Sequence, residues 1–281
     1  MAARCWIGTS GWTYPSWRGV FYPENLPSRD CLAYYAREFS TTEVNYSFYH
    51  LPKPETYAKW AGQVPAGFLF SLKASRLITH TKRLAGVAEP WRLFVERARG
   101  LGAHLGPILL QFPPSLRKDR TRLERFLDVV AKDAKKQASL RLVFEFRHKS
   151  WFTEDVYRLL RRRGAALCIA DSPRYPRKDV LTTDFAYLRF HGRTELFASK
   201  YSEAELREEA RRVGGYLRKG MEVFVYFNND AQGHAVANAR TLRALINPTA
   251  LPPPAQSSHQ GQELRARSRD RRSEPAEAEG V

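Results

Sequence analysis

Ionisable side chains recur at the ends of short apolar runs in this 281-residue chain. Five of them carry oxygen or imidazole ligand atoms: Glu43, Glu145, Asp171, His191 and Asp230. Such groups bind Mg²⁺, Mn²⁺ or Zn²⁺, and they also transfer protons as general acid and base. We interpret them as the candidate catalytic set, which would hold a divalent metal or activate water. No local spacing motif identifies the metal, so its identity stays unknown.

A second set of side chains is suited to binding a ligand. Four cations follow the same apolar runs and could stabilise phosphoryl charge: Lys73, Arg147, Arg189 and Arg193. Arg18 could neutralise a phosphate while Trp12 and Tyr46 stack on bases or sugars. The remaining candidate binding residues are polar or aromatic: Asn45, His80, Gln111, His148, Trp151, Asn228 and Asn229.

The elements that must position these groups alternate between β-rich runs and segments of helical period, which is typical of parallel βα units. Eight strands are expected, near residues 5–8, 41–46, 68–73, 108–111, 141–147, 165–171, 186–191 and 222–228. Seven helices are expected, over 29–39, 54–61, 89–101, 120–136, 153–163, 202–219 and 233–246. The stretch 171–184, with Pro173 and Pro176, has no amphipathic period and predicts a crossover without a helix. The pattern predicts one TIM-type (β/α) barrel domain over residues 1–249.

Chemistry in such a barrel takes place at the carboxyl ends of the strands. The period of two in a strand places Glu43 with Asn45, and Glu145 with Arg147, on common faces. Because an unpaired buried charge is costly, the converging groups need partners. They form either a ligand site, which the convergence favours, or a structural network in which Glu43 and Glu145 neutralise Arg147 and Arg189.

Aromatic residues crowd the loop at 12–22, where they could stack on a ligand or cap the barrel mouth. We favour the cap, with one or two rings left exposed to ligand.

The charge balance favours anionic partners. Lys and Arg number 46 against 29 Asp and Glu, a net charge of +17. The segment after Pro248 holds five Arg and five acidic residues, so the excess belongs to the preceding part. Nucleic acid or a phosphorylated small molecule is the expected partner, although a generally basic proteome would also give this charge. Residues 250–281 contain almost no large apolar side chain and are expected to be a disordered tail.

Several classes are disfavoured. Three scattered cysteines give neither a disulfide framework nor a CxxC metal site, which favours a cytoplasmic location. No apolar run approaches the roughly 20 residues that cross a bilayer, so no membrane partner is expected. The chain lacks a nucleophile elbow and a P-loop. A retaining glycosidase of the usual barrel layout would need carboxylates where Gln111 and His191 stand.

The chain resembles the YecE-like family, known as domain of unknown function 72. Ten ordered motifs carry the resemblance: GTSGWTY at 8–14, WRGVFYP at 17–23, TEVNYSFY at 42–49, FSLKA at 70–74, ITH at 78–80, QFPP at 111–114, EFRHKSW at 145–151, ADSP at 170–173, HGR at 191–193 and YFNND at 226–230. The resemblance spans about residues 5–247 and implies a TIM-type barrel. It implies no mechanism. Its barrel is similar to that of endonuclease IV and the xylose isomerase group, which bind divalent metals at strand ends, an analogy at the level of the fold.

These observations lead to a ranked set of hypotheses. The first is a barrel protein that binds a phosphate-bearing ligand, with nucleic acid favoured, and that hydrolyses a phosphodiester with metal help. The second is a metal-independent enzyme on a sugar or sugar phosphate, with Glu43 and Glu145 as acid and base. The third is a non-catalytic binding protein. The sequence does not specify an oligomeric state.

Overall fold

The computed structural model describes residues 4–134 and 140–246. Every strand pairing in this part of the chain is parallel. One sheet has the order β1-β9-β8-β7 and the other β2-β3-β4-β5-β6. The strands are β1 (Cys5–Thr9), β2 (Thr41–Val44), β3 (Leu69–Lys73), β4 (Leu105–Gln111), β5 (Leu142–Glu145), β6 (Ala166–Leu167), β7 (Ile169–Asp171), β8 (Phe185–Phe190) and β9 (Glu222–Phe227).

The two sheets join into a ring at both of their edges. A parallel bridge between Ser10 and Glu43 connects β1 to β2, and Gly11 N donates to Glu43 O at 2.7 Å. At the other edge only Cys168 separates β6 from β7, and Cys168 N donates to Phe144 O of β5 at 2.9 Å. The predicted strand 165–171 is therefore two short strands with a break at Cys168. The predicted TIM-type barrel is confirmed.

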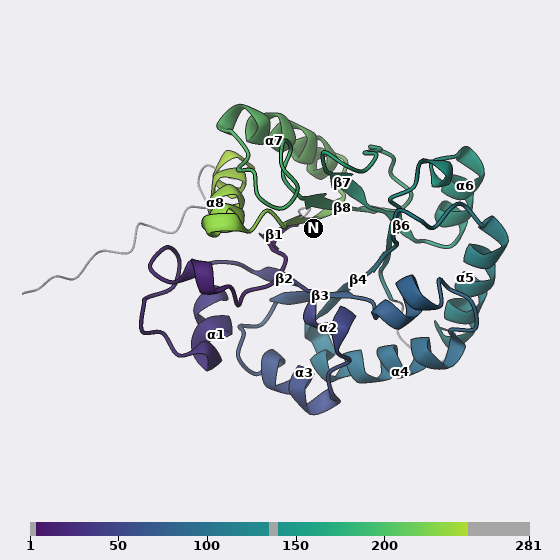
Figure 1. Cartoon of the computed structure of the whole chain (residues 1–281), viewed down its shortest axis with the longest axis horizontal. Helices are drawn as coiled ribbons and strands as arrows, with labels where there is room; N and C mark the ends of the chain where they lie inside the picture. Colours follow the sequence, from purple (N-terminus) through teal and green to yellow (C-terminus); the bar gives the residue numbers. More distant parts are fainter. Residues whose placement is uncertain (1–3, 135–139, 247–281) are drawn as a thin grey trace, which may run out of the picture. The chain divides into compact units, whose positions relative to one another are not determined.

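Helices surround the strands (Figure 1). Those of the described residues are α1 (Cys31–Tyr35), α2 (Tyr46–Tyr49), α3 (Pro54–Ala61), α4 (Ala88–Ala98), α5 (Arg120–Ala134), α6 (Glu154–Arg162), α7 (Glu203–Arg218) and α8 (His234–Ile246). Pro54 begins α3 at a position where its missing N–H costs nothing. Ser202 begins α7 with a capping box, in which its side chain accepts from Glu205 N while the Glu205 side chain accepts from Ser202 N.

Several predicted elements differ from the structure in their extent. The helix expected over 29–39 is α helical only over Cys31–Tyr35, because short-range bonds such as Glu38 N to Tyr35 O tighten its end. The helix expected over 89–101 ends at Ala98 and continues in tighter turns that kink at Gly102, where φ is +55°. The strand expected over 41–46 ends at Val44, because α2 begins at Tyr46, and the sequence did not indicate that helix.

The crossover from β7 to β8 contains no helix, as predicted, and all of its residues are described. No helix in the described residues is long and apolar enough to cross a membrane. The three cysteines are free. The tail predicted from residue 250 lies outside the described residues.

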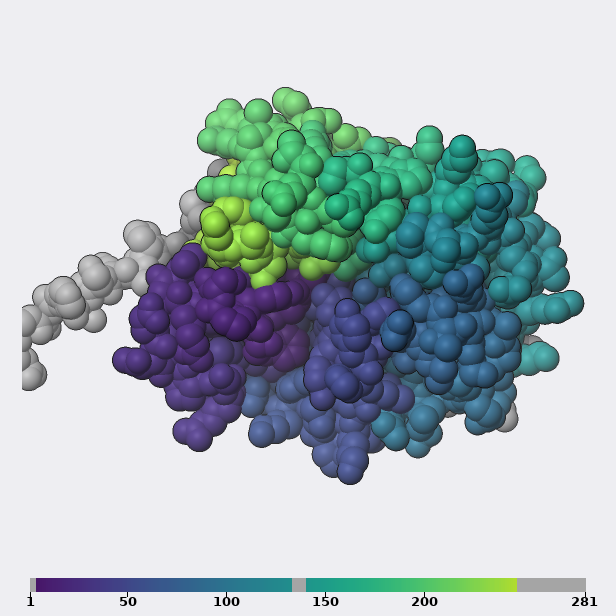
Figure 2. Space-filling model, in the orientation of Figure 1, coloured from purple at the N-terminus to yellow at the C-terminus, as the bar shows by residue number. Residues whose placement is uncertain are grey.

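Alternate residues of each strand point into the barrel. The lower interior is apolar or hydroxylated, and its buried side chains include Trp6, Leu109, Val143, Tyr187 and Tyr226. Towards the carboxyl ends of the strands the same inward positions become charged, and this end is called the barrel mouth below. On one side of the molecule the first described segments lie beside α8 (Figure 2), where Arg240 and Arg243 pair with Glu38 at 2.6 and 3.3 Å.

Candidate ligand-binding site at the barrel mouth

A buried arginine joins two carboxylates at the centre of the barrel mouth. Arg189 on β8 donates from Nη2 to Glu43 Oε1 on β2 at 2.7 Å, and from Nη1 to Glu145 Oε2 on β5. None of these three side chains is more than 1% exposed. Because an unpaired buried charge is strongly unfavourable, each group depends on the others to stay charged. We call Glu43, Glu145 and Arg189 the buried trio.

Two hydroxyl groups complete the surroundings of Glu43. Ser10 Oγ donates to Oε1 at 2.7 Å, and Tyr187 OH donates to Oε2 at 2.6 Å. Burial by itself raises the pKa of Glu43, but the Arg189 charge and these hydrogen bonds outweigh burial and hold the pKa below its ordinary value. Glu43 is therefore ionised at neutral pH.

Glu145 has a second arginine partner. Arg147 Nε donates to Glu145 Oε1 at 2.8 Å, and the Arg147 guanidinium lies over the ring of Tyr175, 4.3 Å from its centroid. Burial raises the pKa of Glu145, but Arg189 and Arg147 outweigh burial and hold the pKa well below its ordinary value. The Arg147 side chain is 12% exposed, so it reaches from the buried trio to the solvent side of the mouth.

His191 is a neutral neighbour of the buried trio. Its Nδ1 lies 3.2 Å from Asn228 Nδ2, and its Nε2 lies 3.9 Å from Glu145 Oε2. Burial, followed by the Arg189 charge, lowers the pKa of His191 to about 4. At neutral pH its imidazole is therefore uncharged.

Lys73 ends β3 at the same mouth. Its Nζ lies 4.2 Å from the centroid of the Phe48 ring. Burial, followed by the Arg189 charge, lowers the pKa of Lys73 to about 7. His80 also packs edge-on against Phe48, and burial together with the Lys73 charge lowers the pKa of His80 to about 4. Gln111 is buried and donates to Phe112 O at 2.8 Å.

The mouth therefore holds more cationic than anionic groups. The two carboxylates of the buried trio are shared by Arg189 and Arg147, while Lys73 pairs with no carboxylate among the described residues. One positive charge is left without a partner whenever Lys73 is protonated. An anion entering the mouth would compensate this charge.

An aromatic cavity of about 730 Å³ lies at the ends of β1 and β2. Trp12 and Trp60 line it with their rings edge to face at 5.3 Å, and Tyr46 also lines it with 53% of its surface exposed. Arg29 and Lys59 add positive charge to the lining. Glu55 also lines it, with one negative charge. The cavity thus presents flat rings with two cations and one carboxylate, and the rings suit a planar or sugar-containing ligand.

Asn45 connects the cavity to the barrel mouth. It follows Glu43 by two residues and lines the cavity, and Gly11, which bonds to Glu43 O, lines it as well. Asn45 Oδ1 is buried and has no hydrogen-bond partner among the described residues. Buried polar atoms are nearly always satisfied in folded proteins, so this oxygen is an unsatisfied acceptor beside the cavity.

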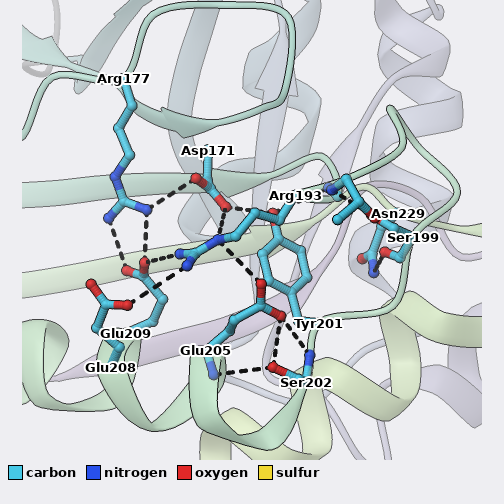
Figure 3. Close-up of polar contacts among 12 residues, drawn as sticks. Asp171, Arg177, Arg193, Ser199, Tyr201, Ser202, Glu205, Glu208, Glu209 and Asn229 are labelled. Atoms are coloured by element: carbon cyan, nitrogen blue, oxygen red, sulfur yellow. Dashed lines mark hydrogen bonds and ion pairs between the residues drawn. The ribbon is translucent and has the colours of Figure 1, made fainter.

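Asp171 does not join the buried trio. In Figure 3 its carboxylate lies between Arg177 and Arg193, at 3.3 and 3.5 Å, and it accepts from Tyr201 OH at 2.8 Å. Ala170, its neighbour, is the residue that faces the barrel interior. The carboxylate therefore belongs to a network outside the barrel, which the glutamates of α7 complete and which we call the outer network.

The two residues at the end of β9 are also engaged elsewhere. Asn229 is fully buried and donates to Ser199 O and Asn238 Oδ1, both at 2.9 Å. Asp230 accepts from the Trp17 indole at 2.6 Å, and burial raises its pKa to about 7. The structure therefore places Asp230 beside the aromatic loop, without a contact to the buried trio.

Three predicted binding residues hold loops in place. His148 Nδ1 accepts from Ser150 N at 3.1 Å at the start of a turn. The buried Trp151 donates its indole N–H to Leu116 O at 2.8 Å. Arg18 donates to the carbonyls of Glu24 and Leu26, both at 2.7 Å.

The aromatic loop divides between the two predicted roles. Trp17, Phe21 and Tyr22 are buried and pack on one another, with ring centroids 4.7 to 5.8 Å apart. They form an accessory core. Trp12 and Tyr14 are only partly buried and line the cavity, so they are the rings of this loop that are placed to meet a ligand.

The candidate catalytic residues do not fit a divalent metal. The oxygens of Glu43 and Glu145 already bind guanidinium groups, and Asp171 and Asp230 lie elsewhere. A cation placed between the two glutamates would adjoin the Arg189 charge. Within residues 4–134 and 140–246 no group of three His, Cys, Asp or Glu side chains is arranged to hold a metal.

Sequence reasoning missed several residues of the site. Trp60 and Lys59 lie on α3 and reach the cavity only through the packing of that helix. Tyr175 lies in the helix-free crossover and covers Arg147. Ser10 and Tyr187 bond to Glu43, and the alternation along β1 and β8 would have indicated them as inward-facing.

Comparison with known proteins identifies relatives over almost the whole chain. Residues 6–261 match the family model described as "Protein of unknown function DUF72". The UPF0759 protein YunF of Bacillus subtilis is 23% identical over 275 residues, covering 86% of this chain and 94% of YunF. The UPF0759 protein YecE of Escherichia coli K12 is 26% identical over 217 residues, covering 68% of this chain and 75% of YecE.

Solved structures share the fold. A DUF72 family protein from Thermotoga maritima is 28% identical, with a TM-score of 0.71 and coverage of 87% of this chain and 99% of that one. A DUF72 family protein from Enterococcus faecalis is 20% identical, with a TM-score of 0.73 and coverage of 86% and 95%.

Proposed function

The chain belongs to the DUF72 family of proteins of unknown function, and on that premise we propose that its barrel mouth and aromatic cavity bind a phosphate-bearing ligand, with nucleic acid as the favoured form. The observation that carries the proposal is the surplus of cations beside the cavity. Arg147 and Lys73 adjoin the buried trio, and Trp12 and Trp60 line the cavity next to it. Arginine and lysine bind phosphates, while aromatic rings stack on bases.

The net charge of +17 supports a polymeric anion over a small one. A strongly basic surface attracts nucleic acid through release of counterions, independently of base sequence. An adjoining aromatic cavity then favours single strands, whose bases are free to stack.

The proposal is confined to binding. Metal-assisted hydrolysis receives no support from side chains that already bind arginines. Acid–base catalysis on a sugar by Glu43 and Glu145 is not supported either. Both carboxyls have lowered pKa values, so neither is a protonated acid at neutral pH.

Binding of a fluorescent single-stranded oligonucleotide tests the proposal. We expect the affinity to fall steeply between about 50 and 200 mM salt. Arg147→Gln removes one phosphate contact and should weaken binding to all sequences alike, reducing the salt slope by about 0.7. Trp12→Ala removes a stacking surface worth about 1–3 kcal/mol per base, a loss of roughly 5- to 150-fold.

The matched control is Arg141→Gln. Arg141 precedes β5 and pairs with Glu222 at 2.7 Å, at the end of the barrel opposite the mouth. This variant should bind as the unaltered protein does. Absence of binding at low salt, or equal losses in Arg141→Gln and Arg147→Gln, would refute the proposed site.

A further inference from the structure

Lys73 has an unusual position among the lysines that the structure describes. Lys73 is the last residue of β3 and follows Ser71 by two residues. The Oγ of Ser71 lies 2.7 Å from Tyr187 OH inside the barrel, and residues two apart in a strand share a face, so the Lys73 side chain lies on the inward face as well. Its side chain is half-buried beneath the Phe48 ring. Carboxyl ends of barrel strands are where reacting groups lie in this fold.

Lys73 forms no ion pair among the described residues, although the charges of Glu145 and Glu43 lie close enough to favour its protonated form. No carboxylate among the described residues lies within ion-pairing distance of Nζ. The nearby Glu43 and Glu145 are instead bound to Arg189 and Arg147. A buried amine next to another cation loses its proton easily, and a lysine activated in this way is a nucleophile at neutral pH. Burial and Arg189 lower the pKa of Lys73 to about 7, so about half of the amine is neutral there.

Arg147 supplies a place for an anionic group near this amine. In the described part of the chain it donates to Glu145 through Nε, which leaves its terminal nitrogens for a ligand. Those nitrogens form a fork that matches a carboxylate or a phosphate.

We propose that Lys73 is a nucleophilic amine that forms an imine with a carbonyl compound carrying a carboxylate or phosphate group. The assignment of an anionic group to the carbonyl compound rests on the proposed function, whereas the formation of an imine by Lys73 does not. The Nζ lone pair forms a bond to the carbonyl carbon, and the C=O bond breaks. The oxygen leaves as water with both protons of the neutral amine, and a proton from solvent gives the cationic imine.

Reductive trapping tests the imine. The full-length protein is treated with acetaldehyde and sodium cyanoborohydride over a range of pH, and labelled lysines are quantified by peptide mass spectrometry. The exposed Lys82 is the internal reference. At pH 7 we expect Lys73 to be labelled at least about tenfold faster than Lys82, with a pH midpoint near 7. Labelling of Lys73 no faster than that of Lys82, or a midpoint near 10, would overturn the proposal.

A second probe separates the imine from the anion site. Glyoxylate carries a carboxylate next to its aldehyde, so the labelling ratio of Lys73 to Lys82 should rise further with glyoxylate than with acetaldehyde. If Lys73 is fast with acetaldehyde but glyoxylate gives no additional preference, the nucleophile stands and the anionic substrate is wrong. Lys73→Arg should abolish the adduct in that peptide while leaving Lys82 labelling and the circular dichroism spectrum unchanged.

Discussion

At the scale of single residues, the distinctive feature is a guanidinium buried between two carboxylates. Arg189 and its partners Glu43 and Glu145 occupy positions that most barrels of this type fill with branched apolar side chains. Glu43 depends on Arg189 for its counter-charge, whereas Glu145 is also paired with Arg147.

Replacing Arg189 tests that dependence. Arg189→Met leaves Glu43 buried without a counter-charge and Glu145 paired with Arg147 alone, and we expect a loss of about 3–5 kcal/mol in the free energy of unfolding at pH 7. Urea unfolding measures this. Arg193→Met is the control, because the Arg193 side chain is 34% exposed and Arg177 still binds its partners. Its cost should be about 1 kcal/mol or less.

The loss in free energy of unfolding caused by Arg189→Met should depend on pH. The pKa values of Glu43 and Glu145 are lowered in the fold, so the stability they contribute is present above the ordinary value of 4.5 and is lost as the pH falls through the lowered values. In Arg189→Met burial is no longer outweighed at Glu43, so the pKa of Glu43 rises above its ordinary value and its carboxyl takes up a proton at a higher pH, while Arg147 still opposes burial at Glu145. The difference in the free energy of unfolding between the two proteins should therefore narrow as the pH falls from the raised pKa of Glu43 in the variant, through 4.5, to the lowered pKa values of the unaltered protein. A difference that stays constant would contradict the assignment.

At the scale of elements, the crossover from β7 to β8 is held without a helix of its own. Arg177 of the crossover donates to both oxygens of Glu209 on α7, at 2.7 and 2.9 Å, and Arg193 adds a third contact at 3.2 Å. Glu209 is fully buried, while its neighbour Glu208 is about half exposed. Ion pairing to α7 thus replaces the packing that a crossover helix would provide.

Glu209→Gln should loosen this crossover. The change removes a bidentate charged contact, and we expect a loss of about 2 kcal/mol with faster hydrogen exchange over residues 172–184. Glu208→Gln, on the same helix and about half exposed, should change stability by about 0.5 kcal/mol or less. Equal effects of the two variants would mean that the outer network does not hold the crossover.

At the scale of the whole molecule, the excess positive charge lies in the part that precedes the tail. Residues 250–281 contain five Arg and five acidic residues, so their removal leaves the net charge at +17. The field that attracts a polyanion is thus a property of the preceding residues.

Truncation after residue 249 tests this distribution. Oligonucleotide affinity and its salt slope should stay within about twofold of those of the full-length protein, because the net charge and the phosphate contacts are retained. A loss of binding would assign the interaction to the Arg-rich tail and remove the barrel mouth from the proposal.

The sequence by itself determined the barrel and the helix-free crossover. Glu43 and Glu145 are buried inside the barrel, as a period of two along a single strand predicts without any partner strand. The predicted common faces do not extend to Asn45 and Arg147, because β2 ends at Val44, β5 ends at Glu145, and Asn45 has helical backbone angles. Residues 165–170 are apolar on both faces, so nothing there indicated that Asp171 points outward.

Only the tertiary structure decided which charges meet. Arg189 lies 146 residues from Glu43 and 44 from Glu145, and their pairing depends on ring closure. The positions of Trp60 and Lys59 likewise depend on how α3 packs. Local periodicity is a property of the backbone and can be predicted from neighbouring residues, whereas pairing through space depends on the register and closure of the whole sheet.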